Sequence, residues 1–244
     1  MKKIFLASFV LLSFVYHAQS FSQIIAEKGN GHVVTLKRSV SKFEKIKCEG
    51  KVEMRFYVND EYHAVVTIDS NLDKYIEVST KDDMLSIKNK NNGMYAEEAF
   101  TQCLVEIYCP VIKSVSIFGS GSFGCADKII TSTFVADISG SGRIDGIFEC
   151  DNFSAKISGS GGITVAGVSR DTNISITGSG KFSGIVFETK NAVIKIGGSG
   201  KASICVADNL NVTLSGEGYG GEIIYRGEPT IESNISGSGK IIKM

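Results

Sequence analysis

The chain has 244 residues, of which 43% are apolar, and it carries 26 acidic and 26 basic side chains. A formal net charge of zero leaves no electrostatic footprint for a nucleic acid or an anionic membrane. Glycine is abundant (27) and proline is scarce (2), which excludes collagen-like and proline-rich linker classes, and the apolar content excludes a disordered chain.

Residues 1–20 are typical of a secretory signal peptide. Lys2 and Lys3 precede an apolar stretch at 4–16, and Ala18 and Ser20 are the small residues of a cleavage site. The apolar stretch is too short for the roughly 20 residues that span a bilayer. The sequence therefore predicts export to the periplasm or the outer cell surface, with no membrane-spanning segment in the mature chain.

Residues 21–118 are predicted to be a β-rich part of the protein. Apolar and polar residues alternate from Val52 to Val58, as they do in a strand with one buried face. Further short strands are predicted at 64–68, 76–78, 85–87 and 103–109. The polar stretch 89–101 predicts a loop or a short helix. We expect these strands to be continuous with the repeats that follow, and a separate small β-domain is the alternative.

Residues 119–244 contain a glycine triplet at nearly constant spacing. Gly-Ser-Gly begins at six positions, and Gly-Glu-Gly completes the series, with successive spacings of 21, 19, 19, 20, 18 and 21 residues. The first residues of the triplets are Gly119, Gly140, Gly159, Gly178, Gly198, Gly216 and Gly237. A repeat of this length is typical of solenoids, in which one unit buries its apolar face only by stacking on the next.

Apolar residues keep register with the triplets. The residue two positions before each triplet is always aliphatic: Ile117, Ile138, Ile157, Ile176, Ile196, Leu214 and Ile235. A second inward row is predicted after the triplets, at Phe123, Ile144, Ile163, Phe182, Ala202, Gly220 and Ile241. Because this period of two is that of a strand with one buried face, the sequence predicts an all-β fold, a parallel β-helix or β-solenoid.

The triplets are predicted to be structural corners between the two strands of each coil. Glycine there lets the backbone adopt a positive φ and lets neighbouring coils approach closely. The predicted corner glycines are Gly119, Gly121, Gly140, Gly142, Gly159, Gly161, Gly178, Gly180, Gly198, Gly200, Gly216, Gly218, Gly237 and Gly239.

Three ordered segments resemble the bacterial auto-transporter adhesin, head GIN domain family. They are an opening strand at 40–47 followed by 52–58, the pair 76–78 and 85–87, and the passage at 105–121 into the first triplet. The resemblance runs from about residue 40 to the end of the chain. It implies an exported, β-helical, adhesin-like protein, and it supplies no catalytic or ligand-contacting residues to carry over.

Several motifs that suggest chemistry are rejected. Residues 119–124 and 216–221 match G-x-G-x-x-G, but a dinucleotide site needs a helix after the glycines, and strands are expected here. Calcium-binding repeats recur about every nine residues, which is not the period found. His32 and His63, expected at the surface, have no evident catalytic partner. We therefore predict no catalytic, cofactor-binding or metal-ligating residues.

Six cysteines lie in the predicted mature chain: Cys48, Cys103, Cys109, Cys125, Cys150 and Cys205. An oxidising compartment would permit disulfides, and six cysteines allow 15 full pairings among which the sequence does not choose. Buried free thiols are the alternative. No C-x-x-C occurs, so the sequence indicates neither a redox motif nor a zinc site.

The sequence thus favours an adhesin-like interaction protein or a structural protein without catalytic activity. Its partner would be a protein or a glycan at the cell surface. The alternative is a carbohydrate-binding or carbohydrate-active β-helix, which would need carboxylates clustered on adjacent coils.

Overall fold

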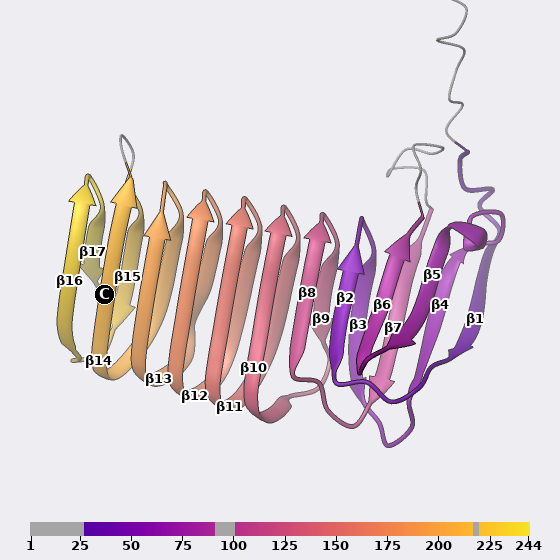
Figure 1. The fold of residues 1–244 in the computed structure, drawn as a ribbon, viewed down its shortest axis with the longest axis horizontal. Helices are drawn as coiled ribbons and strands as arrows, with labels where there is room; N and C mark the ends of the chain where they lie inside the picture. The colour runs from indigo at the N-terminus through magenta and orange to yellow at the C-terminus, as the bar shows by residue number, and fades with distance from the viewer. Residues whose placement is uncertain (1–26, 91–100, 217–219) are drawn as a thin grey trace, which may run out of the picture.

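The computed structural model describes residues 27–90, 101–216 and 220–244, and 17 strands of these residues wind into a β-solenoid (Figure 1). The predicted all-β solenoid is confirmed. The predicted signal peptide lies outside the described residues, and so does most of the predicted loop at 89–101. The predicted division at residue 118 stays a prediction.

The repeat region forms the long body of the solenoid. Its strands are β8 (Ser114–Gly119), β9 (Ser122–Cys125), β10 (Ile129–Gly140), β11 (Arg143–Gly159), β12 (Gly162–Gly178), β13 (Lys181–Gly197), β14 (Lys201–Gly216), β15 (Glu222–Arg226), β16 (Thr230–Gly237) and β17 (Lys240–Lys243).

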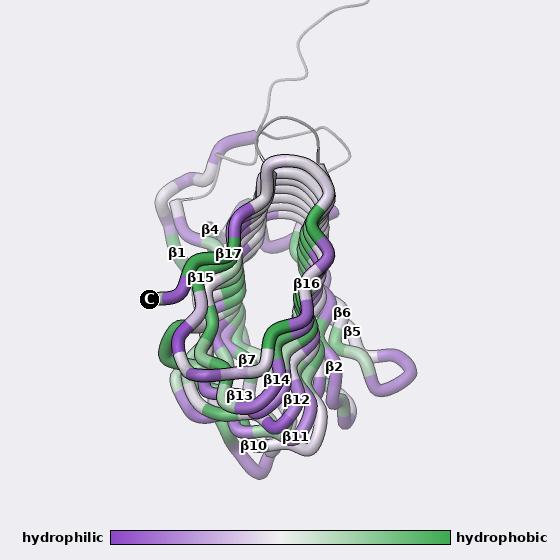
Figure 2. The backbone as a smooth tube through the Cα atoms, turned by 90° about the vertical axis from the view of Figure 1, so that its left-hand side faces the viewer, coloured by the Kyte–Doolittle hydropathy of each residue, from purple (hydrophilic) through white to green (hydrophobic). Residues whose placement is uncertain are grey.

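Each long strand from β11 to β14 descends from one glycine corner, bends, and ascends to the next corner. We call the two sides of the solenoid the descending face and the ascending face. Neighbouring coils pair in parallel on both, with Ile144 beside Ile163 on the descending face and Ile157 beside Ile176 on the ascending face. Viewed along the axis, the two faces enclose one interior, with the corners stacked at its upper end (Figure 2).

The interior is filled by the predicted inward rows. The aliphatic residues before the triplets are at most 1% exposed from Ile117 to Leu214, whereas Ile235 in the last coil is 41% exposed. Near the bend opposite the glycine corners, Phe153 packs against the rings of Phe134, Phe148 and Phe187 with centroids 5.0–5.9 Å apart. Burial of these rows holds the coils together, since apolar area removed from water is the main stabilising term.

The corner glycines occupy two kinds of position. At Gly159 φ is +120°, and a Cβ would lie 2.5 Å from the carbonyl oxygen of Gly140 in the preceding coil. At Gly161 a Cβ would point inward and lie 2.6 Å from Cγ2 of Ile138. The first kind of position requires glycine because its backbone is left-handed. The second requires glycine because a side chain there would clash with the preceding coil. Positive φ is found at Gly119, Gly140, Gly159, Gly178, Gly198 and Gly237, while Gly216 lacks it and Gly218 lies outside the described residues.

The predicted inward position of Gly220 is wrong. Ile223 is the residue that pairs with Ala202, and it is fully buried. Gly221 takes the place that Gly200 has one coil earlier, because a Cβ there would lie 2.7 Å from Cγ2 of Ile196. The corner that begins at Gly216 therefore ends five positions later, at Gly221. The preceding corner begins at Gly198 and ends two positions later, at Gly200.

Residues before the repeats form the other end of the solenoid. Their strands are β1 (Val33–Ser39), β2 (Lys45–Glu49), β3 (Glu53–Val58), β4 (His63–Asp69), β5 (Ile76–Lys81), β6 (Met84–Asn89) and β7 (Cys103–Cys109), with a 3₁₀ turn, η1 (Asp73–Tyr75). β2 pairs in parallel with both β6 and β8, and β3 with both β7 and β9. The coil of β2 and β3 is thus inserted between coils that come later in the chain.

Antiparallel strands end the solenoid on this side. β5 pairs with β6 on the ascending face, while β4 pairs with β7 and β1 with β4 on the descending face. The change from parallel to antiparallel pairing marks where the regular winding stops. Figure 1 shows this end in indigo and violet, opposite the yellow C-terminal coil.

Asp69, at the end of β4, is a buried carboxylate that joins three segments. It is 0% exposed and accepts hydrogen bonds from the backbone N–H groups of Gly31 (2.9 Å) and Thr101 (2.8 Å). Burial raises the pKa of Asp69, but the hydrogen bonds from Thr101 and Gly31 outweigh it, so the pKa lies below its ordinary value of 3.8.

Replacing Asp69 by Ala should destabilise the protein by about 1–3 kcal/mol at pH 7, because the N–H groups of Gly31 and Thr101 lose their charged acceptor. Since the folded-state pKa is the lower one, this contribution is complete above pH 3.8 and is lost as the pH falls through the folded-state pKa. Urea unfolding of both proteins at pH 7 and under strongly acidic conditions measures it. An equal difference in unfolding free energy at both pH values would contradict the assignment.

Candidate functional site

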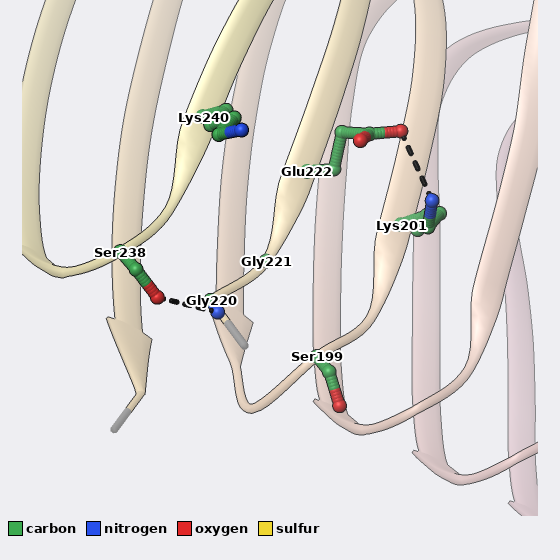
Figure 3. A pocket seen from close by; sticks show the side chains of 7 residues that line it. All are labelled: Ser199, Lys201, Gly220, Gly221, Glu222, Ser238 and Lys240. Carbon is green, nitrogen blue, oxygen red and sulfur yellow. Dashed lines mark hydrogen bonds and ion pairs between the residues drawn. The ribbon is translucent and has the colours of Figure 1, made fainter. Parts of the chain in front are cut away.

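A polar groove lies at the glycine corners of the last coils, where β14, β15 and β17 begin (Figure 3). It has a volume of about 380 Å³. The residues that line it come from three successive coils: Ser199, Lys201, Gly220, Gly221, Glu222, Ser238 and Lys240.

Charged side chains stand on one row along the groove. The register places Lys201 beside Glu222 and Glu222 beside Lys240, one residue from each coil. The Lys201 ammonium lies 3.2 Å from Glu222 Oε1, and the Lys201 side chain is 60% exposed while that of Glu222 is 30% exposed. Figure 3 shows Lys240 on the far side of Glu222, without a dashed contact to it. The row thus carries two cations around one carboxylate.

Hydroxyl and backbone groups line the corner side of the groove. The N–H of Gly220 donates to Ser238 Oγ at 2.9 Å, which ties two successive corners together. Ser199 lies at the corner before them, and its hydroxyl is 3.5 Å from that of Ser179. Two serine hydroxyls, those of Ser199 and Ser238, therefore lie beside the row of charges, and the triplet between them has Glu217 in place of serine.

The regular repeat explains why these residues meet. The first position after each corner faces outward, and stacking in register turns it into the row of Arg143, Gly162, Lys181, Lys201, Glu222 and Lys240. The groove lies where this row passes from Lys201 through Glu222 to Lys240. Cations and hydroxyls at this spacing can hold a ligand that carries hydroxyl groups and a negative charge.

Two further hollows lie elsewhere on the described surface. One, of about 320 Å³, is polar and lies between β2, β5 and β6, where Lys47, Glu77 and Lys88 contribute to it. The other, of about 310 Å³, is largely apolar and includes Ile147 and Val186 on the descending face, which are 47% and 60% exposed.

The two histidines of the predicted mature chain lie apart from the groove. His32 is exposed, as predicted. His63 was also expected at the surface, and this is wrong in part, because its ring stacks on that of Tyr108 with centroids 4.4 Å apart and its Nδ1 is buried. In residues 27–90, 101–216 and 220–244 no three His, Cys, Asp or Glu side chains gather as metal ligands would.

All six cysteines are free thiols in the structure. Cys48 and Cys109 are buried, and burial raises the pKa of Cys48, Cys103 and Cys109 to about 12. These thiols are therefore protonated at neutral pH and are poor nucleophiles. Of the two alternatives that the sequence left open, the structure shows free thiols.

The groove itself was missed by sequence reasoning. No ligand-binding residue was predicted from the sequence, so Lys201 and Lys240 had no predicted role. A usable signal was present, because Gly-Lys follows the serine of three triplets, at Lys181, Lys201 and Lys240. The change of register after this triplet left no such signal, since Gly-Glu-Gly at 216 resembles the other triplets.

The sequence matches the family described as "putative auto-transporter adhesin, head GIN domain" over residues 42–229. The chain belongs to this family. No curated protein matches the sequence. In the part of the chain that the structure describes, no helix could cross a membrane.

Solved structures of bacterial proteins share the fold. A putative adhesin from Bacteroides fragilis superposes with a TM-score of 0.82 at 17% identity, covering 89% of this chain and 99% of its own. A putative adhesin from Parabacteroides distasonis gives 0.69 at 23% identity, with 90% and 100% covered. A putative lipid binding protein from the same species gives 0.67 at 24% identity, with 89% and 98% covered.

Proposed function

We propose that this protein is an exported, adhesin-like interaction protein without catalytic activity, and that its groove binds an acidic glycan at the cell surface. Membership of the adhesin family supports the general role. The observation that carries the ligand class is the row of Lys201, Glu222 and Lys240 beside the corner serines. Export is supported by the basic and apolar pattern of residues 1–20.

The groups in the groove suit a glycan better than an apolar ligand. Serine hydroxyls and the Gly220–Ser238 contact offer donors and acceptors to sugar hydroxyls. Lys240 and the exposed Lys201 supply charge for a carboxylate or a sulfate on the sugar, and Glu222 partly offsets them. Lysines recur on the outward row at Lys181, Lys201 and Lys240, so a linear chain of sugars along the corners could gain affinity from several weak contacts.

A carbohydrate-active enzyme on this scaffold is the less favoured alternative. Glycoside hydrolysis uses two carboxyl groups on either side of the scissile bond, roughly 5 to 9.5 Å apart. The described groove has one carboxylate, Glu222, and it forms an ion pair with Lys201. This arrangement supports binding more than turnover.

Lipid binding is a second candidate, favoured by one observation. The apolar hollow with Ile147 and Val186 exposes aliphatic side chains on the descending face. A relative of the same fold is called a putative lipid binding protein. An acyl chain would be held there by burial of apolar area, without help from the charged groove.

Removing the two cations should weaken glycan binding. In the double variant Lys201→Gln/Lys240→Gln, we expect at least a tenfold higher Kd for an acidic glycan, since each lost charged hydrogen bond is worth about 1.5–3 kcal/mol. Binding of the purified protein to an array of acidic and neutral glycans, with long-chain fatty acids as added probes, measures this.

The matched control is Lys156→Gln/Lys195→Gln, which removes two exposed cations from the ascending face. If the control weakens binding as much as the groove variant does, only net charge matters and the groove is not the site. Binding of fatty acids without any glycan would support the apolar hollow instead. Binding of neither would contradict the proposed function.

A further inference from the structure

Among the described residues, the groove leaves one carboxylate oxygen and one ammonium without a partner. The ion pair of Lys201 with Glu222 uses a single carboxylate oxygen, Oε1, at 3.2 Å. In the same described part of the chain, Oε2 of Glu222 accepts no hydrogen bond and the ammonium of Lys240 forms no ion pair. One charged acceptor and one charged donor are therefore open to a ligand.

These two groups stand one coil apart on the same row. Glu222 begins β15 and Lys240 begins β17, and the two residues pair in register. Both line the groove, and neighbouring coils are about 4.8 Å apart. Figure 3 shows Glu222 between Lys201 and Lys240, with a contact to Lys201 alone. A ligand that reaches both open groups needs an anionic group and a donor within about one coil spacing of each other.

Lys201 orients the Glu222 carboxylate. The Lys201 side chain is 60% exposed and that of Glu222 is 30% exposed, so their ion pair adds little to stability. The pair does hold Oε1 toward the preceding coil, which leaves Oε2 for a ligand. Any contact of Lys240 with Glu222 in solution is equally exposed and weak, and ligand groups can replace it.

We propose that the groove selects a glycan that carries an amino group beside its acidic group, and that Glu222 recognises the amino group. This inference rests on the proposed function, because it names the class of glycan for the same groove. The carboxylate or sulfate of the ligand lies at Lys240, and its ammonium lies at Oε2 of Glu222. Opposite charges meet at both positions, and Lys201 keeps its contact with Oε1.

Glu222 also acts against other glycans. A glycan with acidic groups on every sugar brings a second anion toward the Glu222 carboxylate, and like-charge repulsion disfavours it. An acetamido group offers Oε2 a neutral N–H, which makes a weaker hydrogen bond than an ammonium does. At this position the groove therefore prefers an amino group to an acetamido group, and an acetamido group to an acidic one.

A matched pair of polymers tests this preference. The first is a linear polysaccharide in which a uronic acid alternates with an N-acetylated amino sugar, and the second is the same polymer after partial removal of its acetyl groups. At mildly acidic pH the freed amines are protonated. Isothermal titration calorimetry should show at least tenfold tighter binding of the deacetylated polymer, since a hydrogen bond between two charged groups replaces a weaker one.

General attraction between charges predicts the opposite order. Deacetylation makes the polymer less negative, so a groove that responded only to net charge would bind it more weakly. Tighter binding of the deacetylated form therefore reports a carboxylate in the site and not the cations around it.

The variant Glu222→Gln assigns the preference to its residue. It should bind the acetylated polymer at least as tightly as the parent protein does and lose the preference for the deacetylated one. The matched control is Glu149→Gln, which removes an exposed carboxylate paired with Lys128 at 3.0 Å and outside the groove lining. This control should keep the preference, and both variants should keep the parent melting temperature.

Three outcomes would overturn the proposal. If the protein binds both polymers with equal affinity, or the acetylated one more tightly, the groove takes an acidic glycan without reading an amino group, and the proposed function stands. A preference that persists in Glu222→Gln places the recognition elsewhere. Binding of neither polymer overturns the proposed function and this inference together.

Discussion

Replacing Ile157 by Asp should unfold the solenoid. Ile157 is 0% exposed and lies between Ile138 and Ile176 in the central inward row of the ascending face. Truncating a buried isoleucine alone costs about 2–5 kcal/mol, and an unpaired carboxylate in the apolar interior adds further cost. Together these approach the whole stability of a typical domain, about 5–15 kcal/mol.

Circular dichroism and a thermal melt measure this effect. The control is Ser175→Asp on the exposed row of the same face, between Lys156 and Lys195, where the same charge should change stability little. A native melting curve for Ile157→Asp would contradict the inward register on which the whole fold depends.

Replacing Gly159 by Ala should destabilise the protein by about 3 kcal/mol. Its φ of +120° is unfavourable for any residue with a Cβ, and the added carbon would lie 2.5 Å from the carbonyl oxygen of Gly140. Because that oxygen belongs to the backbone of the neighbouring coil, relief requires the two coils to move apart.

Gly162→Ala is the matched control for this prediction. The neighbour of its added Cβ is the carbonyl oxygen of Lys181 at 3.8 Å, an ordinary contact, and its φ is not in the left-handed region. Urea unfolding of both variants compares them. Equal losses of unfolding free energy in the two variants would show that the corner conformation is not the reason for glycine at 159.

The solenoid could be predicted because its signal is local and repeated. Inward positions such as Ile138 and Ile157 recur at a fixed distance from each triplet, so one strand predicts the next. Even the polar residue Thr172 keeps its inward place, because Ser169 and Thr189 give it buried hydroxyl partners at 2.6 and 3.0 Å. Hydrogen-bonded in this way, a polar side chain is tolerated inside the core.

The predictions that failed concern features that depend on contacts between segments distant in the sequence. Insertion of β2 and β3 between later coils depends on pairing with β6 to β9, and no periodicity within residues 45–58 shows it. At the corner after Gly216, the extra residues shifted the predicted register, so Gly220 was placed where Ile223 lies. His63 is partly covered because Tyr108 comes from another strand.

The groove was hidden for the same reason. Lys201, Glu222 and Lys240 are about 20 residues apart along the chain and become neighbours only through stacking in register. The row could have been written down from the repeat, but the hollow beside it could not. Sequence reasoning thus predicted the scaffold more fully than the site.

The most direct test of binding without turnover is to incubate the purified protein with an acidic polysaccharide and follow both bound glycan and newly formed chain ends. With Glu222 as the one carboxylate among the described groove residues, we predict saturable binding and no increase in chain ends over time. A steady release of chain ends that Glu222→Gln abolishes would contradict the non-catalytic account and identify the groove as an active site.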